Sequence, residues 1–338
     1  YLDSYATGGT YQGVTSLGPV RLFNPDFMWE VNRKFEVALE LGFNEDKLVV
    51  NAAYFNNRSS NQLLGYTLPA TTGFASIRSN LPATVQNTGI EIDLSSINIK
   101  RQRFEWKTSF NMTFPKNKLV EFPDLQSSTY RNSFAIGEPL NISKRYNYTG
   151  IDPVTGLFQF EDTNGDGGIN SLDRQTIMPI GQTMYGGLNN SFSYKGLKLD
   201  IFIQFVQQTA PGFFANSDIP VGSGRNQPVE VLSHWKTDAT NYAFQRYTAG
   251  YDDAAATAFY NYSLSNATIV NASFIRLKNV SLAYTLPQTW TRDTKINFYI
   301  QGQNIWTMTS YIGPDPENYG RTVLPPLRTL IAGIQLTF

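Results

Sequence analysis

Hydrophobic and polar side chains alternate along the last eleven residues of the chain, 328–338. Consecutive side chains of an extended strand point to opposite faces, so residues two apart share a face. One face carries Leu330, Ala332, Ile334, Leu336 and Phe338, and the other carries Thr329, Gly333, Gln335 and Thr337, with Ile331 as the exception. A strand of roughly 9–11 residues can cross a bilayer when it is tilted. A strand of a soluble β-sandwich alternates in the same way, so this segment alone leaves both kinds of protein open.

The same alternation recurs along the chain and predicts nine strands. It is clearest where Phe104, Trp106 and Phe110 share one face and Glu105 and Lys107 share the other. The nine predicted segments are 33–43, 48–57, 87–97, 104–114, 184–194, 197–207, 273–286, 295–306 and 328–338. Segments separated by short turns form hairpins, and the pair Lys195-Gly196 is expected to turn one of them. The pattern therefore predicts an all-β, antiparallel chain.

The connections between these strands alternate between short and long. Long connections are expected at 58–86, 115–183, 208–272 and 307–327, and the third is expected to contain a short helix at 227–235, because proline suits a first helical turn. An up-and-down barrel of an outer membrane has short turns at one end and long loops at the other. Such barrels have even strand numbers in bacteria. Nine therefore implies either a hidden strand in the first thirty residues, which are otherwise expected to form a loop, or part of a larger barrel.

Composition narrows the possible functions. Charged residues make up only 16% of the chain and the formal net charge is zero, so nothing indicates a nucleic-acid partner. No apolar run approaches the roughly 18 residues of a membrane-spanning helix. Cysteine is absent, which excludes disulfides and thiolate metal sites. The chain begins at Tyr1 without a signal peptide, so we expect it to be the mature or truncated remainder of a longer protein.

Six short motifs follow one another along nearly the whole chain: 24–30 (NPDFMWE), 85–91 (VQNTGIE), 148–156 (YTGIDPVTG), 162–174, 274–287 (FIRLKNVSLAYTLP) and 301–304 (QGQN). Together they resemble the SusC/RagA family of TonB-linked outer-membrane transporters of Bacteroidota. A final alternating strand that ends on an aromatic residue, here Phe338, also resembles bacterial outer-membrane barrels. The resemblance implies that residues 1–338 are the C-terminal portion of a large, plugged antiparallel barrel of the 22-stranded class. The plug, the TonB box and the N-terminal strands would lie outside this sequence.

The resemblance also implies a function. A chain of this family would be a transporter and not an enzyme, and would sit in the cell outer membrane and import oligosaccharides or oligopeptides. Its partners would be a SusD-like surface lipoprotein and, through the missing N-terminal region, the TonB complex. One alternative is a SusC-like barrel that serves as an accessory subunit of a larger secretion or assembly complex. A third reading is a soluble, carbohydrate-binding β-sandwich with a calcium loop.

Residues 162–173 form the motif with the most specific chemistry. Oxygen-bearing residues stand at positions 1, 3, 5 and 12, with glycine at 6 and isoleucine at 8, which is the spacing of an EF-hand-type calcium loop. The candidate ligands of a structural Ca²⁺ are Asp162, Asn164, Asp166, the carbonyl of Gly168, and Asp173. Asp replaces Glu at position 12, as in dockerin-like loops, and no long amphipathic helix precedes the motif. A polar surface turn, which Asp, Asn and Gly favour by themselves, remains open.

The other candidate residues carry weaker signals. Polar residues expected to face a barrel lumen are Glu36, Glu40, Glu91, Asp93, Glu105, Lys107 and Gln204. Loop aromatics can stack on sugars or grip peptides, but such residues more often hold loops together; they are Tyr66, Phe74, Phe213, Phe214, Tyr242, Phe259 and Tyr260. His234 is the only histidine and is expected to pack within a loop, which argues against a histidine-based triad. Glu161 and Asp162 are adjacent and therefore do not form a glycosidase pair.

Overall fold

The computed structural model describes residues 4–291, 294–319 and 323–338, and all of their side chains except those of residues 64, 66 and 67. The chain divides into two compact units. Unit 1 comprises Tyr1–Val37, Tyr54–Gly89 and Lys116–Leu140. Unit 2 comprises Ala38–Ala53, Ile90–Pro115 and Asn141–Phe338. Each unit has its own buried clusters, the one in unit 1 being formed by Leu81, Ala83, Val85, Leu119, Phe122 and Leu125.

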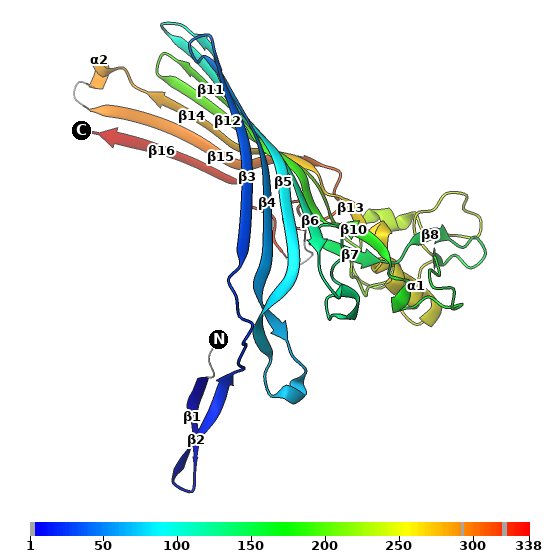
Figure 1. Cartoon of the computed structure of the whole chain (residues 1–338). Helices are drawn as coiled ribbons and strands as arrows, with labels where there is room; N and C mark the ends of the chain where they lie inside the picture. Colours follow the sequence, from blue (N-terminus) through cyan, green and yellow to red (C-terminus); the bar gives the residue numbers. More distant parts are fainter. Residues whose placement is uncertain (1–3, 292–293, 320–322) are drawn as a thin grey trace. The chain divides into compact units, whose positions relative to one another are not determined.

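One antiparallel sheet of ten strands dominates the fold, and its hydrogen-bonded order is β16-β15-β14-β12-β11-β6-β5-β4-β3, with β13 paired to β12. Its strands are β3 (Val31–Phe43), β4 (Leu48–Thr67), β5 (Ser76–Lys100), β6 (Phe104–Glu121), β11 (Gly181–Tyr194), β12 (Leu197–Pro211), β13 (Ile269–Asn271), β14 (Phe274–Thr285), β15 (Lys295–Thr309) and β16 (Thr329–Thr337). Figure 1 shows β11, β12, β14, β15 and β16 side by side in unit 2. Apart from β13, the strands of this sheet pair in the order in which they occur along the chain, which is the up-and-down order.

All nine predicted strands are present, and the antiparallel all-β class is confirmed. The turn at Lys195-Gly196 is also confirmed, because both residues have positive φ, 46° and 86°, as a tight hairpin turn requires. A side chain at position 196 would place its Cβ 2.6 Å from the carbonyl oxygen of Thr285, so only glycine fits there.

The register sorts side chains of the sheet in unit 2 onto two faces. Leu199 lies opposite Leu282, which lies opposite Ile300, which lies opposite Ala332. One residue along, a polar row runs on the other face through Asp200, Ser281 and Gln301. On the apolar face, Ile300 and Ile334 remain 60% and 62% exposed. This sheet therefore presents a broad apolar surface that no part of the described chain covers.

The segment 58–86, expected to be a long connection, is mostly strand. β4 continues to Thr67 and β5 begins at Ser76, so only residues 68–75 connect them, including a 3₁₀ turn at Ala70–Thr72. β6 likewise continues past its predicted end at residue 114 to Glu121. Residues 58–62 of β4 are all polar, and the adjacent Leu63 and Leu64 do not alternate with polar residues. The period-two signal therefore stops in these extensions, although the strands continue.

The first thirty residues were expected to form a loop. They instead contain a hairpin of β1 (Ser4–Tyr11) and β2 (Val14–Arg21). Gln12 and Gly13 turn it with positive φ, 49° and 78°. The two strands pair only with each other and form a separate sheet. Two strands were hidden here, but they do not extend the nine-strand path.

The connection 115–183 is also more structured than expected. It contains β7 (Ile142–Arg145), β8 (Tyr148–Ile151), β9 (Phe158–Phe160) and β10 (Thr176–Pro179), with β7 paired to β10 and β8 to β9. The helix expected at 227–235 is only a 3₁₀ turn, Val229–Leu232. The main helix of the connections is instead α1 (Asp253–Ser263), which the sequence analysis missed. Within the described residues, no helix is both long and apolar enough to cross a membrane.

Candidate functional site

The connections of unit 2 fold onto one aromatic cluster. Its buried members are Phe158, Val221, Val231, Phe244, Ala258 and Phe259, and its partly buried members include Tyr148, Phe214 and Tyr262. Phe158 stacks on Tyr262 with ring centroids 4.0 Å apart. Burial raises the pKa of Tyr262 to about 12, so its hydroxyl stays neutral at physiological pH. The cluster joins β9, in the connection between β6 and β11, to α1, in the connection between β12 and β14. These elements are far apart in the sequence.

Helix α1 is fixed at both ends. The side chain of Asp252 accepts a hydrogen bond from the Ala255 amide at 3.1 Å and forms an ion pair with Arg246. At the other end, Arg145 of β7 is only 5% exposed and donates from Nη1 to the Ser263 carbonyl at 3.1 Å. Burial lowers the pKa of Arg145, and the nearby charge of Arg174 lowers it further. The carbonyl end of a helix carries partial negative charge and stabilises this cation.

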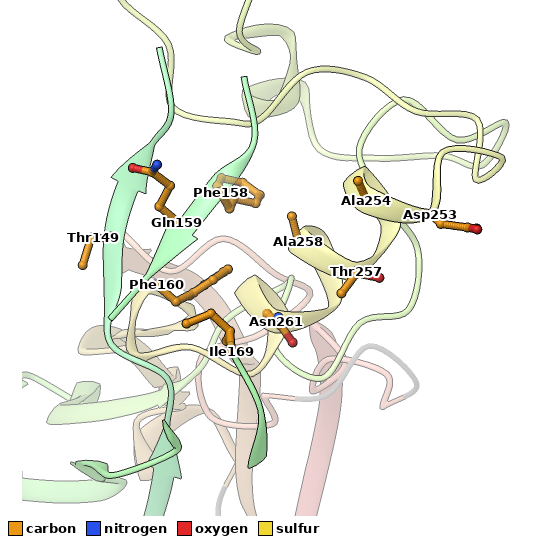
Figure 2. A pocket seen from close by; sticks show the side chains of 10 residues that line it. All are labelled: Thr149, Phe158, Gln159, Phe160, Ile169, Asp253, Ala254, Thr257, Ala258 and Asn261. Atoms are coloured by element: carbon orange, nitrogen blue, oxygen red, sulfur yellow. The ribbon is translucent and has the colours of Figure 1, made fainter. Parts of the chain in front are cut away.

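An open pocket of about 710 Å³ lies between β9 and α1. Phe158, Phe160 and Ile169 line one side, and Ala254 and Ala258 of the helix line the other, as Figure 2 shows. Polar side chains complete the lining: Thr149, Gln159, Asp253, Thr257 and Asn261. The local sequence predicts none of these residues as ligand contacts, because their types are common and α1, which carries five of them, is not predicted.

The predicted calcium loop closes on itself. The carboxylate of Asp162 accepts hydrogen bonds from the amides of Gly165 at 2.7 Å and Gly167 at 2.8 Å. Gly167, at position 6, has φ +84°, the sharp turn that this position requires. The Asn164 side-chain oxygen accepts from the Asp166 amide at 3.0 Å, and Asp166 Oδ1 accepts from the Gly168 amide at 2.9 Å.

The last predicted ligand, Asp173, is fully buried and ties the two ends of the loop together. Its oxygens accept from the amides of Thr163 at 2.8 Å and Asn170 at 2.9 Å. The hydrogen bond from Asn170 is the main reason why the pKa of Asp173 is lowered. In the described part of the chain, no three His, Cys, Asp or Glu side chains are grouped so as to hold a metal ion. The calcium site therefore stays a prediction, while the chain's own amides already satisfy these carboxylates.

A buried ion cluster fixes the last long connection. Arg276 of β14 is 1% exposed and forms ion pairs with Asp315 and Glu317, both at 2.5 Å. Lys278 joins Glu317 at 3.3 Å. The local sequence does not indicate this cluster, because Arg276 and Asp315 are 39 residues apart. Because breaking a buried ion pair leaves an uncompensated charge, Arg276 holds residues 315–317 against the strand.

The expected lumen residues are placed on the sheet as follows. Glu105 and Lys107 form an ion pair at 3.0 Å on β6. Register through β11 puts them on the same polar face as Gln204, which lies opposite Gly187 and Arg276. Four others are exposed on β3 and β5, namely Glu36, Glu40, Glu91 and Asp93. That this face lines a channel stays a prediction.

Three of the seven named loop aromatics, Phe213, Phe214 and Phe259, hold the connections together. Phe214 contacts Phe213, Phe244 and Phe259, and Phe259 is 1% exposed. None of the predicted aromatics lines the pocket. Tyr260 is exposed, Phe74 and Tyr242 are partly buried, and the side chain of Tyr66 lies outside the described residues. The His234 ring stacks on Tyr247 at 3.5 Å, in agreement with the predicted packing role.

Comparison with known proteins adds sequence and structural relatives, although no family model matches the chain. TonB-dependent receptor P3 of Formosa agariphila is 27% identical over 330 residues, which cover 88% of this chain and 31% of that protein. TonB-dependent receptor SusC of Bacteroides thetaiotaomicron is 22% identical over 379 residues, which cover 99% of this chain and 34% of that protein. Both are named as receptors, and neither name states a catalytic activity.

Solved structures agree on the fold. The RagAB peptide importer in its open-open state superimposes with a TM-score of 0.79 at 22% identity, over 100% of this chain and 38% of the other. A second structure, titled as the RagAB peptide transporter, gives a TM-score of 0.77 at 21% identity. The chain resembles SusC-type TonB-dependent receptors over most of its length, and it spans about a third of these relatives.

Proposed function

We propose that this chain forms the C-terminal part of an outer-membrane, TonB-dependent transporter that imports large nutrients, oligosaccharides or oligopeptides. The observation that carries the proposal is the uncovered apolar face of the sheet in unit 2. Rows of apolar residues cross β12, β14, β15 and β16 in register, while polar residues occupy the opposite face. Soluble monomers rarely expose so large an apolar surface, whereas the outer face of a membrane barrel alternates in this way.

The remaining parts of the transporter would come from outside this chain. The nine-strand path ends at β3 and β16, which are edge strands here. Unpaired strand edges are not tolerated in a bilayer, so further strands would close the barrel. The relatives are about three times as long as the matched region, which leaves room for those strands, for a plug and for the segment that contacts TonB.

A surface lipoprotein similar to SusD is the partner that the relatives support. Two solved structures that superimpose on this chain are titled as the RagAB peptide transporter and the RagAB peptide importer. The long, folded connections of unit 2 emerge from the same ends of neighbouring strands and would form the docking and capture surface. Transport without catalysis agrees with the names of all these relatives.

The first experiment is purification of the native protein from outer membranes in detergent, followed by mass spectrometry of the intact chain and its companions. We expect a chain about three times as long as this one, together with a single surface lipoprotein, and uptake that is lost in a TonB deletion strain. Recovery in the soluble fraction contradicts membrane insertion. Co-purification with secretion or assembly machinery, and uptake unchanged without TonB, favours the accessory-subunit alternative.

A further inference from the structure

We propose that the pocket between β9 and α1 binds a segment of an oligopeptide in which an apolar side chain lies next to a positively charged group. The inference rests on the proposed function, because it names the substrate class that the connections of unit 2 would capture. It depends on three properties of the lining: an apolar floor, two polar side chains free to bond a ligand, and a single charge.

The floor is apolar and has room for a side chain. Phe158 and Phe160 are two residues apart on β9, so their rings lie on one face, toward α1 (Figure 2). The apolar groups that the helix contributes to this space are the methyl groups of Ala254 and Ala258, and Ile169 adds a further apolar side chain. A volume of about 710 Å³ is in the range of ligand pockets.

Two polar groups on the helix are available to a ligand. Asn261 and Thr257 are four residues apart, hence on the same helical face, and both line the pocket. Within the described residues, the side chains of both make no hydrogen bond. A carboxamide offers both a donor and an acceptor, which matches the C=O and N–H groups of a peptide backbone.

The charge of the pocket favours a cation. Asp253 is the only ionisable residue in the lining, and it forms no ion pair within the described chain. Its neighbour Asp252 is already occupied by Arg246 and by the helix amides. The chain that carries Phe160 and Ile169 continues directly into Glu161, Asp162 and Asp166, which adds negative charge. Anionic ligands, such as acidic glycans, are therefore disfavoured.

A neutral oligosaccharide fits the lining less well than a peptide. Sugar rings stack on exposed aromatic faces, but one face of Phe158 is already covered by Tyr262 at 4.0 Å and the residue is only 4% exposed. No tyrosine or tryptophan lines the pocket. The remaining apolar groups border an open space of about 710 Å³, which accommodates an inserted side chain.

The test uses the full-length transporter with its lipoprotein partner in detergent and a pool of randomised pentapeptides with free termini as the probe. Peptides retained through gel filtration are sequenced by mass spectrometry and compared with the input. We expect enrichment of lysine or arginine together with large apolar residues. Asp253→Asn should reduce the enrichment of basic residues by about fivefold, as expected for one partly exposed ion pair, whereas the exposed control Asp218→Asn should leave it unchanged.

A second variant tests the cavity itself. Ala254→Trp fills the space between the helix and β9 and should lower total peptide retention about tenfold, while the control Ala249→Trp, on an exposed alanine before the helix, should not. Both alanines are exposed, so neither change disturbs a core. Equal retention by wild type and Ala254→Trp, no enrichment over the input, or retention of a pool of neutral malto- and xylo-oligosaccharides in place of peptides overturns the proposal.

Uptake by cells separates this inference from the proposed function. If peptide uptake requires TonB but is insensitive to Ala254→Trp, the pocket assignment fails and the transporter stands. If the purified protein binds basic, apolar peptides in the pocket but uptake proceeds without TonB, the transporter assignment fails and the binding site stands.

Discussion

The sheet of unit 2 and the connections that join its strands are stabilised in opposite ways. In the sheet, hydrogen bonds of the backbone run from strand to strand, and the large apolar residues point outward, such as Ile300 at 60% exposure. In the connections, the large apolar residues point inward, such as Phe259 at 1% exposure, and a few buried polar groups fix the ends. A single exposed isoleucine has little effect on the stability of an ordinary globular protein. In this sheet, Ile300 is expected to contact the lipid of the proposed membrane.

The strongest test of this difference is Arg276→Met. The substitution removes the cation from a cluster in which Asp315 is also buried, and we expect the connection around residue 315 to lose roughly 3–5 kcal/mol of protection. Glu317 is more exposed and contributes less. Hydrogen exchange of residues 310–319 measures the loss. Adding Asp315→Asn should restore part of it, and a double variant as unstable as the single one contradicts the ion-pair explanation.

Phe259→Ala tests the aromatic cluster. Deleting a fully buried ring costs roughly 3–5 kcal/mol, so helix α1 and the β8–β9 hairpin should exchange much faster. The adjacent Tyr260, which is 54% exposed, is the matched control, and Tyr260→Ala should change protection by no more than about 0.5 kcal/mol. Similar effects of the two substitutions would show that the connections have no common core.

Ile334→Arg tests the sheet. An arginine on the lipid side of a barrel costs roughly 2–4 kcal/mol near the middle of the membrane. Ile334 lies opposite Phe298 on the apolar face, whereas Gln335 is the next residue and points to the other face. We expect Ile334→Arg to reduce the amount of folded, heat-resistant barrel in the outer membrane, and Gln335→Arg to have little effect. If Gln335→Arg is the more harmful of the two, the assignment of the faces is reversed.

Calcium tests whether the loop at 162–173 is more than a polar turn. If it binds the ion as the sequence predicts, millimolar Ca²⁺, but not Mg²⁺, should slow proteolysis after Leu172, which is 66% exposed. Asp162→Asn should abolish the effect, whereas Asp152→Asn, in the preceding turn, should not. Equal proteolysis with and without Ca²⁺ would leave the amide hydrogen bonds as the whole explanation of the loop.

Acid should weaken this loop by a small amount. Hydrogen bonds lower the pKa of Asp173, so its contribution to stability is fully present above the carboxyl's unfolded pKa of about 3.9 and is lost as the pH falls through the lower, folded pKa. Pepsin cleavage of the loop should therefore increase between pH 4 and lower values. Asp173→Asn should remove this pH dependence, and an unchanged slope would assign it to another group.

Local sequence patterns predicted the strands in which apolar and polar residues alternate, because there each residue type matches the face on which it lies. The segment 104–114 alternates because one of its faces is apolar, and the strand was found from that alternation. The ends of β4 and β6 were missed because apolar and polar residues do not alternate there, although both strands continue. Helix α1 had a local signal, Asp252 before a run of alanines, but its flanking turn residues concealed it.

The candidate sites also divide into one that a local sequence pattern predicted and others that it did not. The spacing of Asp162, Asn164, Asp166 and Asp173 identified a loop that the structure closes through its own amides. The pocket could not be predicted, because Phe160 and Asn261 are about a hundred residues apart and each is ordinary in its local sequence. Likewise, nothing beside Arg276 in the sequence indicates that Asp315 compensates its charge.

By itself, the sequence determined the antiparallel strands, their two faces and the order in which they pair, because period-two alternation and tight turns act between neighbouring residues. Only the tertiary structure decided which distant side chains share a cavity or an ion pair. Those contacts join segments that are far apart in the sequence and come together only in the folded chain. The stability of the contacts depends on burial, which no local pattern encodes.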